Sequence, residues 1–235
     1  LNHLPLFGPA LLERAVVIRN LSEMLGTVFY VSAIILTPLS SASAILQATP
    51  LAVTLGAAAF LGAPVGWRRW SAITIGFLGV LIIVRPGAEG FMPASLFAVG
   101  GVIFLAARDL ATRSAPVHVP SLILALYGFL AVVPAGAVLM VMQGGWVALP
   151  PGSLMRLCVT AAVGVAAYYA IVAAMRLGEV AVVTPFRYTR ILFALILGIT
   201  VFDETVDRWT LIGAAIIIAS GLYTLLREAR LRRTA

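Results

Sequence analysis

Two arginines stand near the middle of an apolar run that is long enough to cross a bilayer. Arg187 and Arg190 lie within residues 180–202, and Tyr188 lies beside them. The two arginines are three positions apart, so they share one face of a helix. Inserting one central arginine into a bilayer costs roughly 2.5–3.5 kcal/mol, so each guanidinium needs a carboxylate, backbone carbonyls, or a water-filled cavity in which an anion binds. The pair is therefore either structural or part of an anion-binding site.

Other ionisable side chains also interrupt apolar runs. Glu23 follows Arg19 by four residues, one to two turns into an apolar helix. The two form a helical ion pair, or Glu23 takes up a proton or faces a cationic group. Arg108 and Asp109 interrupt a later run. The side chains of Arg108 and Asp109 extend to the membrane surface, or Asp109 neutralises an arginine of residues 180–202. Glu23 and Asp109 are the candidate proton-coupling groups, and Arg108 is a candidate ion-pair partner.

Two adjacent tyrosines, Tyr168 and Tyr169, lie in the middle of another apolar run. One of the two must point inward, and a buried tyrosine hydroxyl needs a hydrogen-bond partner. This placement favours a position in the wall of a cavity.

Catalysis and metal binding are not predicted. Both histidines, His3 and His118, lie outside the apolar runs, so no histidine stands beside a membrane-buried serine. No pair of aspartates falls inside an apolar run for acid–base work. The single cysteine, Cys158, cannot form an internal disulfide or a metal cluster. All 16 basic residues are arginine, which excludes a P-loop lysine and a Schiff-base lysine, and no cofactor is predicted.

The elements that position these residues are membrane helices. Hydrophobic residues make up 62% of the chain and charged residues 11%, against roughly 25% charged in a soluble domain. The net charge of +7 does not point to nucleic acid, because the arginines lie between apolar runs rather than in a patch with interleaved aromatics. We expect an all-α membrane protein with eight transmembrane helices, close to residues 15–36, 40–61, 70–84, 95–112, 120–142, 154–175, 180–202 and 209–226.

The arginines also predict the orientation of the chain, because cytoplasmic loops hold most of the basic residues. With residues 1–13 inside, the outer loops hold only Arg85, Arg156 and Arg208. Both termini are therefore expected in the cytoplasm, and the protein in the inner membrane. The chain begins without methionine or a signal peptide, so we expect a chain shortened at its amino end.

The sequence contains an internal repeat. Residues 39–79 resemble residues 180–221 at an offset of about 141, each as an apolar run, a short polar turn and a glycine-containing run. The first turn is basic, with Arg68 and Arg69, and the second is acidic, with Asp203 and Glu204. An odd number of spans separates the copies, so the two turns lie on opposite faces of the membrane. Secondary transporters use such inverted repeats for alternating access.

The segments Pro38–Ala44, Leu61–Trp70, Gly76–Val80, Thr184–Arg190 and Asp203–Glu204 together resemble the drug/metabolite transporter superfamily, specifically permeases with the EamA-type domain. The resemblance implies ten helices in two inverted five-helix halves around a central cavity. Here residues 1–86 look like an incomplete first repeat of three helices, without its first two, and residues 94–227 like a complete second repeat of five. The acid usual in the first repeat is replaced in Gly62-Ala63.

These observations favour a permease or exporter that carries a small organic metabolite, amino-acid-like or anionic, across the cytoplasmic membrane. The expected substrate pathway contains Arg187, Tyr188, Arg190, Tyr168 and Tyr169. The expected partners are a small-molecule substrate, the lipid bilayer and a second copy of the chain in a homodimer. Two alternatives remain open, a non-transporting membrane scaffold and an inactive truncated permease.

Overall fold

The predicted apolar runs are mainly helical in the residues that the computed structural model describes, which are 9–62, 66–115, 119, 121–145, 150–177 and 187–233. No strand occurs among these residues, so the all-α fold is confirmed. Five helices of this part are long and apolar enough to cross a membrane. The elements are η1 (Pro9–Leu12), α1 (Arg14–Leu36), α2 (Leu39–Leu46), α3 (Thr49–Phe60), α4 (Trp67–Val84), α5 (Ser95–Arg113), α6 (Ser121–Met142), α7 (Ser153–Leu177), η2 (Arg187–Thr189), α9 (Arg190–Val201) and α10 (Arg208–Arg233).

The second predicted run is a broken helix, divided into α2 and α3. Pro50 lacks an N–H and cannot donate to the carbonyl of Leu46 four residues earlier. The hydroxyl of Thr49 donates to that carbonyl instead, at 2.7 Å. The break places Gln47 and Ala48 between the two helices.

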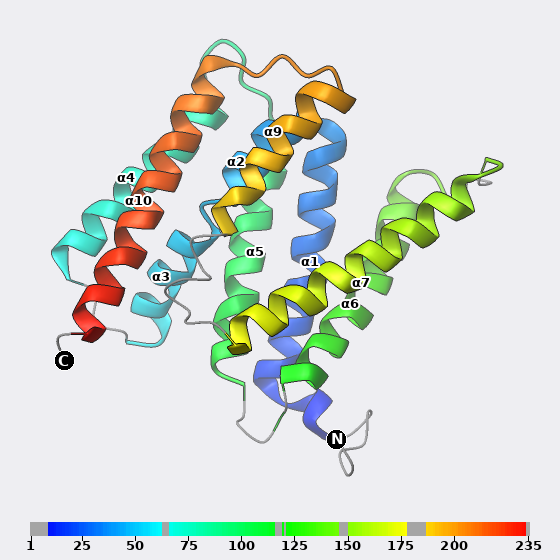
Figure 1. Ribbon diagram of the computed structural model, residues 1–235, viewed down its shortest axis with the longest axis horizontal. Coiled ribbons are helices and arrows are strands. Elements are labelled where there is room, and N and C mark those ends of the chain that lie inside the picture. The colour runs from blue at the N-terminus through cyan, green and yellow to red at the C-terminus, as the bar shows by residue number, and fades with distance from the viewer. Residues whose placement is uncertain are drawn as a thin grey trace.

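The core lies around α2 and the start of α3. Ala42, Ala44, Ile45 and Ala48 are completely buried, and the hydroxyl-bearing Ser43 is nearly so. Helix α2 contacts α1, α5, α9 and α10, so both halves of the sequence surround it. The most extensive helix–helix interfaces of the bundle are those between α1 and α5 and between α4 and α10 (Figure 1).

Helices α4 and α10 run antiparallel and meet at glycines. A Cβ on Gly79 would lie 2.8 Å from the carbonyl oxygen of Gly213, and a Cβ on Gly213 would lie 2.6 Å from that of Gly79. The contacts along these two helices follow the symmetry of the repeat. Gly79 faces Ile217, and Gly76 faces Ser220. Under the offset of 141 these two contacts exchange places. This reciprocity is expected for two copies related by a two-fold axis.

Helices α6 and α7 lie at one side of the bundle (Figure 1). The described side chains of α7, in residues 154–167, are all exposed.

The last helix extends seven residues beyond the predicted end at Leu226, to Arg233. The tail is rich in arginine, leucine and alanine, which are strong helix formers. Glu228 and Arg232 also stand four residues apart, a spacing that favours helix.

Candidate functional site

The two halves of the chain meet where their helices are interrupted. Gln47, at the break between α2 and α3, donates from Nε2 to the backbone carbonyl of Tyr188 at 3.1 Å. Tyr188 lies in η2, immediately before α9. The two residues are 141 positions apart, which is the repeat offset. Equivalent positions of the two repeats therefore touch at the centre of the bundle, which is where transporters with broken helices bind substrate.

Arg190 lies next to this contact. Its guanidinium carbon stands 5.0 Å from the ring centroid of Tyr30, at cation–π distance. The hydroxyl of Tyr30 shares a hydrogen bond of 3.1 Å with that of Ser43 in α2. Ser43 is buried, whereas the Arg190 side chain is exposed. The accessible cation of Arg190 in α9 thus lies over the Tyr30 ring of α1, and Ser43 of α2 holds that ring by its hydrogen bond.

Tyr188 is 5% exposed, and its hydroxyl lies against α10. A Cβ on Gly221 would overlap that hydroxyl oxygen. Of the predicted pathway residues, Tyr188 therefore packs between helices, while Arg190 stands open. The side chains of Arg187, Tyr168 and Tyr169 lie outside the described part of the structure, although Tyr168 and Tyr169 belong to the backbone of α7 and Arg187 opens η2.

The other predicted group forms an ion network between α1 and α5. Arg108 Nη1 stands 3.1 Å from Glu23 Oε1, and Arg108 Nη2 stands 2.7 Å from Asp109 Oδ1. Arg19 Nη2 lies 3.9 Å from Glu23 Oε2, and Arg19 Nη1 donates to Asn20 Oδ1 at 3.0 Å. Two cations and two carboxylates balance one another, so the network brings no net charge into the bundle. Asp109 pairs with Arg108 of its own helix.

Helix α6 approaches the network closely at Gly128. A Cβ at this position would lie 2.8 Å from Arg19 Nη2. A cavity of about 250 Å³ opens beside it between α1 and α6, lined mainly by apolar side chains together with Asn20 and Tyr127. Among the described residues no three His, Cys, Asp or Glu side chains gather as metal ligands would.

One contact between the two halves was not foreseen from the sequence. Glu204, in the turn between α9 and α10, accepts hydrogen bonds at the first turn of α2 from the N–H of Leu39 at 2.5 Å and from the hydroxyl of Ser40 at 2.7 Å. The acidic residues of this turn are visible in the sequence, but they do not indicate that Glu204 binds Ser40, which lies 164 residues away.

Two further contacts join the halves at the same end of the bundle. The hydroxyls of Ser41 and Thr210 share a hydrogen bond of 3.3 Å. Arg85, at the end of α4, forms an ion pair with Asp207, just before α10. With the Glu204 contact, these interactions close that end of the bundle between the halves.

Comparison with known proteins gives a family and a set of relatives. The model of the EamA-like transporter family matches residues 8–85 and 92–226. The S-adenosylmethionine uptake transporter of Rickettsia conorii is 25% identical over 214 residues, which are 91% of this chain and 72% of that protein. The riboflavin transporter of Rhizobium johnstonii is 28% identical over 217 residues, 92% of this chain and 71% of that protein. The riboflavin transporter of Vibrio cholerae is 29% identical over 198 residues, 83% and 65% of the two chains.

A solved structure described only as the crystal structure of a protein has the same fold. It matches with a TM-score of 0.58 at 20% identity, over 90% of this chain and 77% of that one.

Proposed function

Since this chain belongs to the EamA-like transporter family, we propose that it is a secondary transporter whose substrate carries a carboxylate or another anionic group. Membership of the family makes it a multi-pass membrane transporter of small metabolites and not an enzyme. The anionic substrate, the inner membrane and the cytoplasmic termini belong to the proposal.

The observation that carries the proposal is the contrast between Arg190 and two described arginines of the spans, Arg19 and Arg108. Arg19 and Arg108 each stand within 4 Å of a carboxylate. Arg190 pairs with no carboxylate in the described part of the chain, and its contact is the ring of Tyr30. A guanidinium within a membrane span is retained where it pairs or where it faces a water-filled pathway. Arg190 therefore suits an anion that arrives with the substrate.

The depth of Arg190 supports the same role. It begins α9, a helix of 12 residues that ends at Val201. At about 1.5 Å per residue, Arg190 lies about 17 Å from the end of that helix. This is roughly half of the 30 Å hydrocarbon core of a bilayer. In our proposal Arg190 binds the anion at mid-depth, and Arg187, Tyr188, Tyr168 and Tyr169 belong to the same pathway.

Alternating access follows from the two halves, which we assign to residues 1–86 and 94–227. The halves touch near mid-depth through Gln47 and Tyr188, and again at one end through Glu204 and Ser40. Opening that end of the bundle requires the Glu204–Ser40 contact to break. The Gln47–Tyr188 contact lies near the centre of the rotation and therefore moves least. This is the rocking motion that inverted repeats permit around a central site.

Binding and uptake by the purified chain test the proposal. S-adenosylmethionine carries a carboxylate and riboflavin does not, so the two compounds named for the relatives distinguish an anionic requirement from a general one. We expect Arg190→Gln to weaken binding of the carboxylate-bearing substrate tenfold or more, because a hydrogen bond to a charged group contributes about 1.5–3 kcal/mol. Arg156→Gln, at an exposed arginine of α7, is the matched control and should bind as the wild type does.

Equal affinity of Arg190→Gln and wild type would remove Arg190 from the pathway. Binding of riboflavin alone, unaffected by Arg190→Gln, would replace the anionic substrate by a neutral one. If neither compound nor a panel of amino acids and organic anions binds, the non-transporting scaffold becomes the better description.

A further inference from the structure

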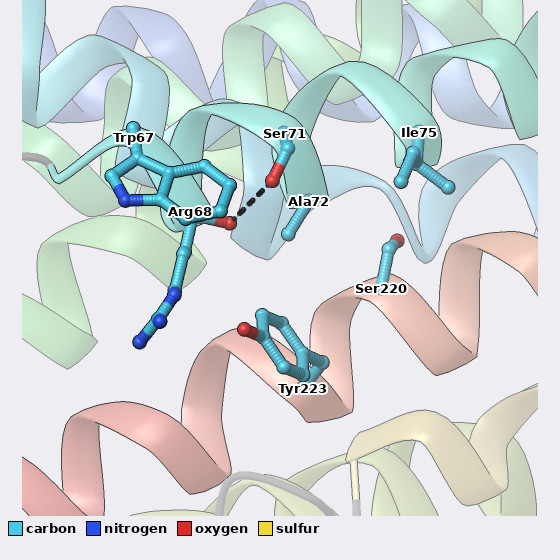
Figure 2. Close-up of a pocket in the computed structure, with 7 residues that line it drawn as sticks. All are labelled: Trp67, Arg68, Ser71, Ala72, Ile75, Ser220 and Tyr223. Atoms are coloured by element: carbon cyan, nitrogen blue, oxygen red, sulfur yellow. Dashed lines mark hydrogen bonds between the residues drawn. The ribbon is translucent and has the colours of Figure 1, made fainter.

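We propose that a groove between α4 and α10 binds the phosphate headgroup of an anionic phospholipid. The groove has a volume of about 350 Å³ and lies between the first half of α4 and the middle of α10. Trp67, Arg68, Ser71, Ser220 and Tyr223 are among the side chains that line it, and Figure 2 shows them on the two facing helices. None of them belongs to the Arg190 site.

Arg68 and Tyr223 are the two groups of the groove that we expect to donate hydrogen bonds to a phosphate. The exposed guanidinium of Arg68 stands 5.2 Å from the ring centroid of Trp67, which restricts where it can point. The hydroxyl of Tyr223 lies in the space between the helices (Figure 2). The hydroxyls of Ser71 and Ser220 already donate to carbonyls of their own helices, each at 2.9 Å. No lining residue is acidic, so an anion entering the groove meets one positive charge and no opposing carboxylate.

The surroundings of the groove favour a lipid over a soluble phosphate. Ala72 and Ile75 continue its lining along α4, and Leu78 and Leu81 follow on the same helix with 51% of each side chain exposed. Trp67 is 73% exposed beside the headgroup position, as interfacial tryptophans are. A phospholipid can place its phosphate at Arg68 and its acyl chains along this apolar surface, whereas a free phosphate ion leaves the surface unused.

The opposite end of the same helix pair lacks this chemistry. The repeat offset of 141 puts Ile82 at the position equivalent to Tyr223, so the hydroxyl is absent there. Of the two arginines at that end, Arg85 is paired with Asp207 and Arg208 lies over the ring of Trp209. An unpaired arginine with a tyrosine is therefore a property of one end of the α4–α10 seam and not of the repeat in general.

Charge also selects the kind of lipid. The groove lies at the end of the bundle that carries Arg68, Arg69 and Arg113, because α3 packs on α5 near Leu110 before it leads to α4. Basic pockets between transmembrane helices at the cytoplasmic surface bind anionic headgroups. The expected cytoplasmic orientation puts this end at the anionic leaflet.

Lipid retention by the whole purified chain tests the site. The protein is delipidated in detergent and titrated with phosphatidylglycerol or phosphatidylcholine, and bound lipid is counted by native mass spectrometry. We expect the wild type to bind phosphatidylglycerol the more tightly. Arg68→Gln should weaken that binding about tenfold and Tyr223→Phe about threefold, from the contributions of charged and neutral hydrogen bonds. Both side chains are exposed, so neither change should impair folding.

Two arginine variants serve as controls. Arg113→Gln removes a cation at the same end of the bundle but outside the groove, and Arg208→Gln removes one that stands 5.4 Å from the ring centroid of Trp209 at the opposite end. Both should retain the affinity of the wild type for phosphatidylglycerol. Equal loss in either control, or no preference for phosphatidylglycerol in the wild type, would overturn the proposal. Displacement of the lipid by millimolar inorganic phosphate would also overturn it, because the site would then bind a soluble anion.

Discussion

Glu204 Oε2 accepts two hydrogen bonds from Ser40, one from its hydroxyl at 2.7 Å and one from its N–H at 3.1 Å, across 164 residues of sequence. The first N–H groups of a helix have no partner within the helix. A carboxylate at this position satisfies them and interacts favourably with the positive end of the helix dipole. The second half of the chain thus supplies the cap of a helix in the first half.

Removing this cap should destabilise the fold. We expect Glu204→Ala to lower the free energy of unfolding by about 2 kcal/mol, since it removes a charged acceptor from the N–H groups of α2. Thermal unfolding of the purified protein in detergent measures the change. Asp203→Asn is the control, because Asp203 is exposed and has a φ of 51°, which asparagine tolerates. A loss of stability as large in Asp203→Asn would show that the turn, rather than the cap, matters.

The glycine contact between α4 and α10 should not accept a methyl group. We expect Gly79→Ala and Gly213→Ala each to cost about 1–3 kcal/mol, because the added Cβ meets a backbone carbonyl that cannot move aside. Gly136→Ala in α6 and Gly164→Ala in α7 meet no atom within 4 Å. These controls should be neutral or stabilising by up to about 1 kcal/mol, from helix propensity. Comparable losses at all four sites would refute close packing at the seam.

The pair formed by Glu23 and Arg108 should show coupling. Their side chains are 15% and 22% exposed, so removing one charge leaves the other poorly solvated. We expect Glu23→Gln to cost about 2 kcal/mol, and the double variant with Arg108→Gln to cost less than the sum of the single variants. A double-mutant cycle of unfolding free energies measures this. Strict additivity would mean that the two groups do not interact.

The Tyr188 hydroxyl can be located by a compensating pair of changes. Gly221→Ala should destabilise the protein by about 1–3 kcal/mol, because its Cβ overlaps that oxygen. Tyr188→Phe removes the oxygen and should restore part of the loss, as melting temperatures of the single and double variants would show. If Gly221→Ala is tolerated in the wild type, the hydroxyl of Tyr188 points elsewhere and remains a candidate for the substrate pathway.

The sequence predicts the positions of the spans because a bilayer demands about 20 apolar residues in each, and that requirement is visible locally. The break before Pro50 follows from a missing N–H and is equally local. The helices begin and end within a few residues of the predicted limits, apart from the extension of α10 into its charged tail and the run 180–202. In that run, residues 180–186 lie outside the described part and α9 begins at Arg190.

The contacts between spans were not predictable in the same way. Arg190 meets Tyr30, and Gln47 meets Tyr188, only after helices distant in sequence pack together. The pairing of Arg108 with Glu23 across 85 residues has the same origin. A sequence shows which side chains are costly to bury, but their partners depend on helix rotation. The assignment of the predicted pathway residues to transport stays a prediction.

The contact of Gln47 with Tyr188 also bears on how such a chain could arise. A residue that touches its own equivalent across a two-fold axis is the mark of an isologous interface between identical subunits. A single ancestral half, inserted into the membrane in both orientations, would have met its copy at this position. Duplication and fusion of its gene would then have kept the contact while freeing each side to change, as an amide on one side and a tyrosine on the other now show.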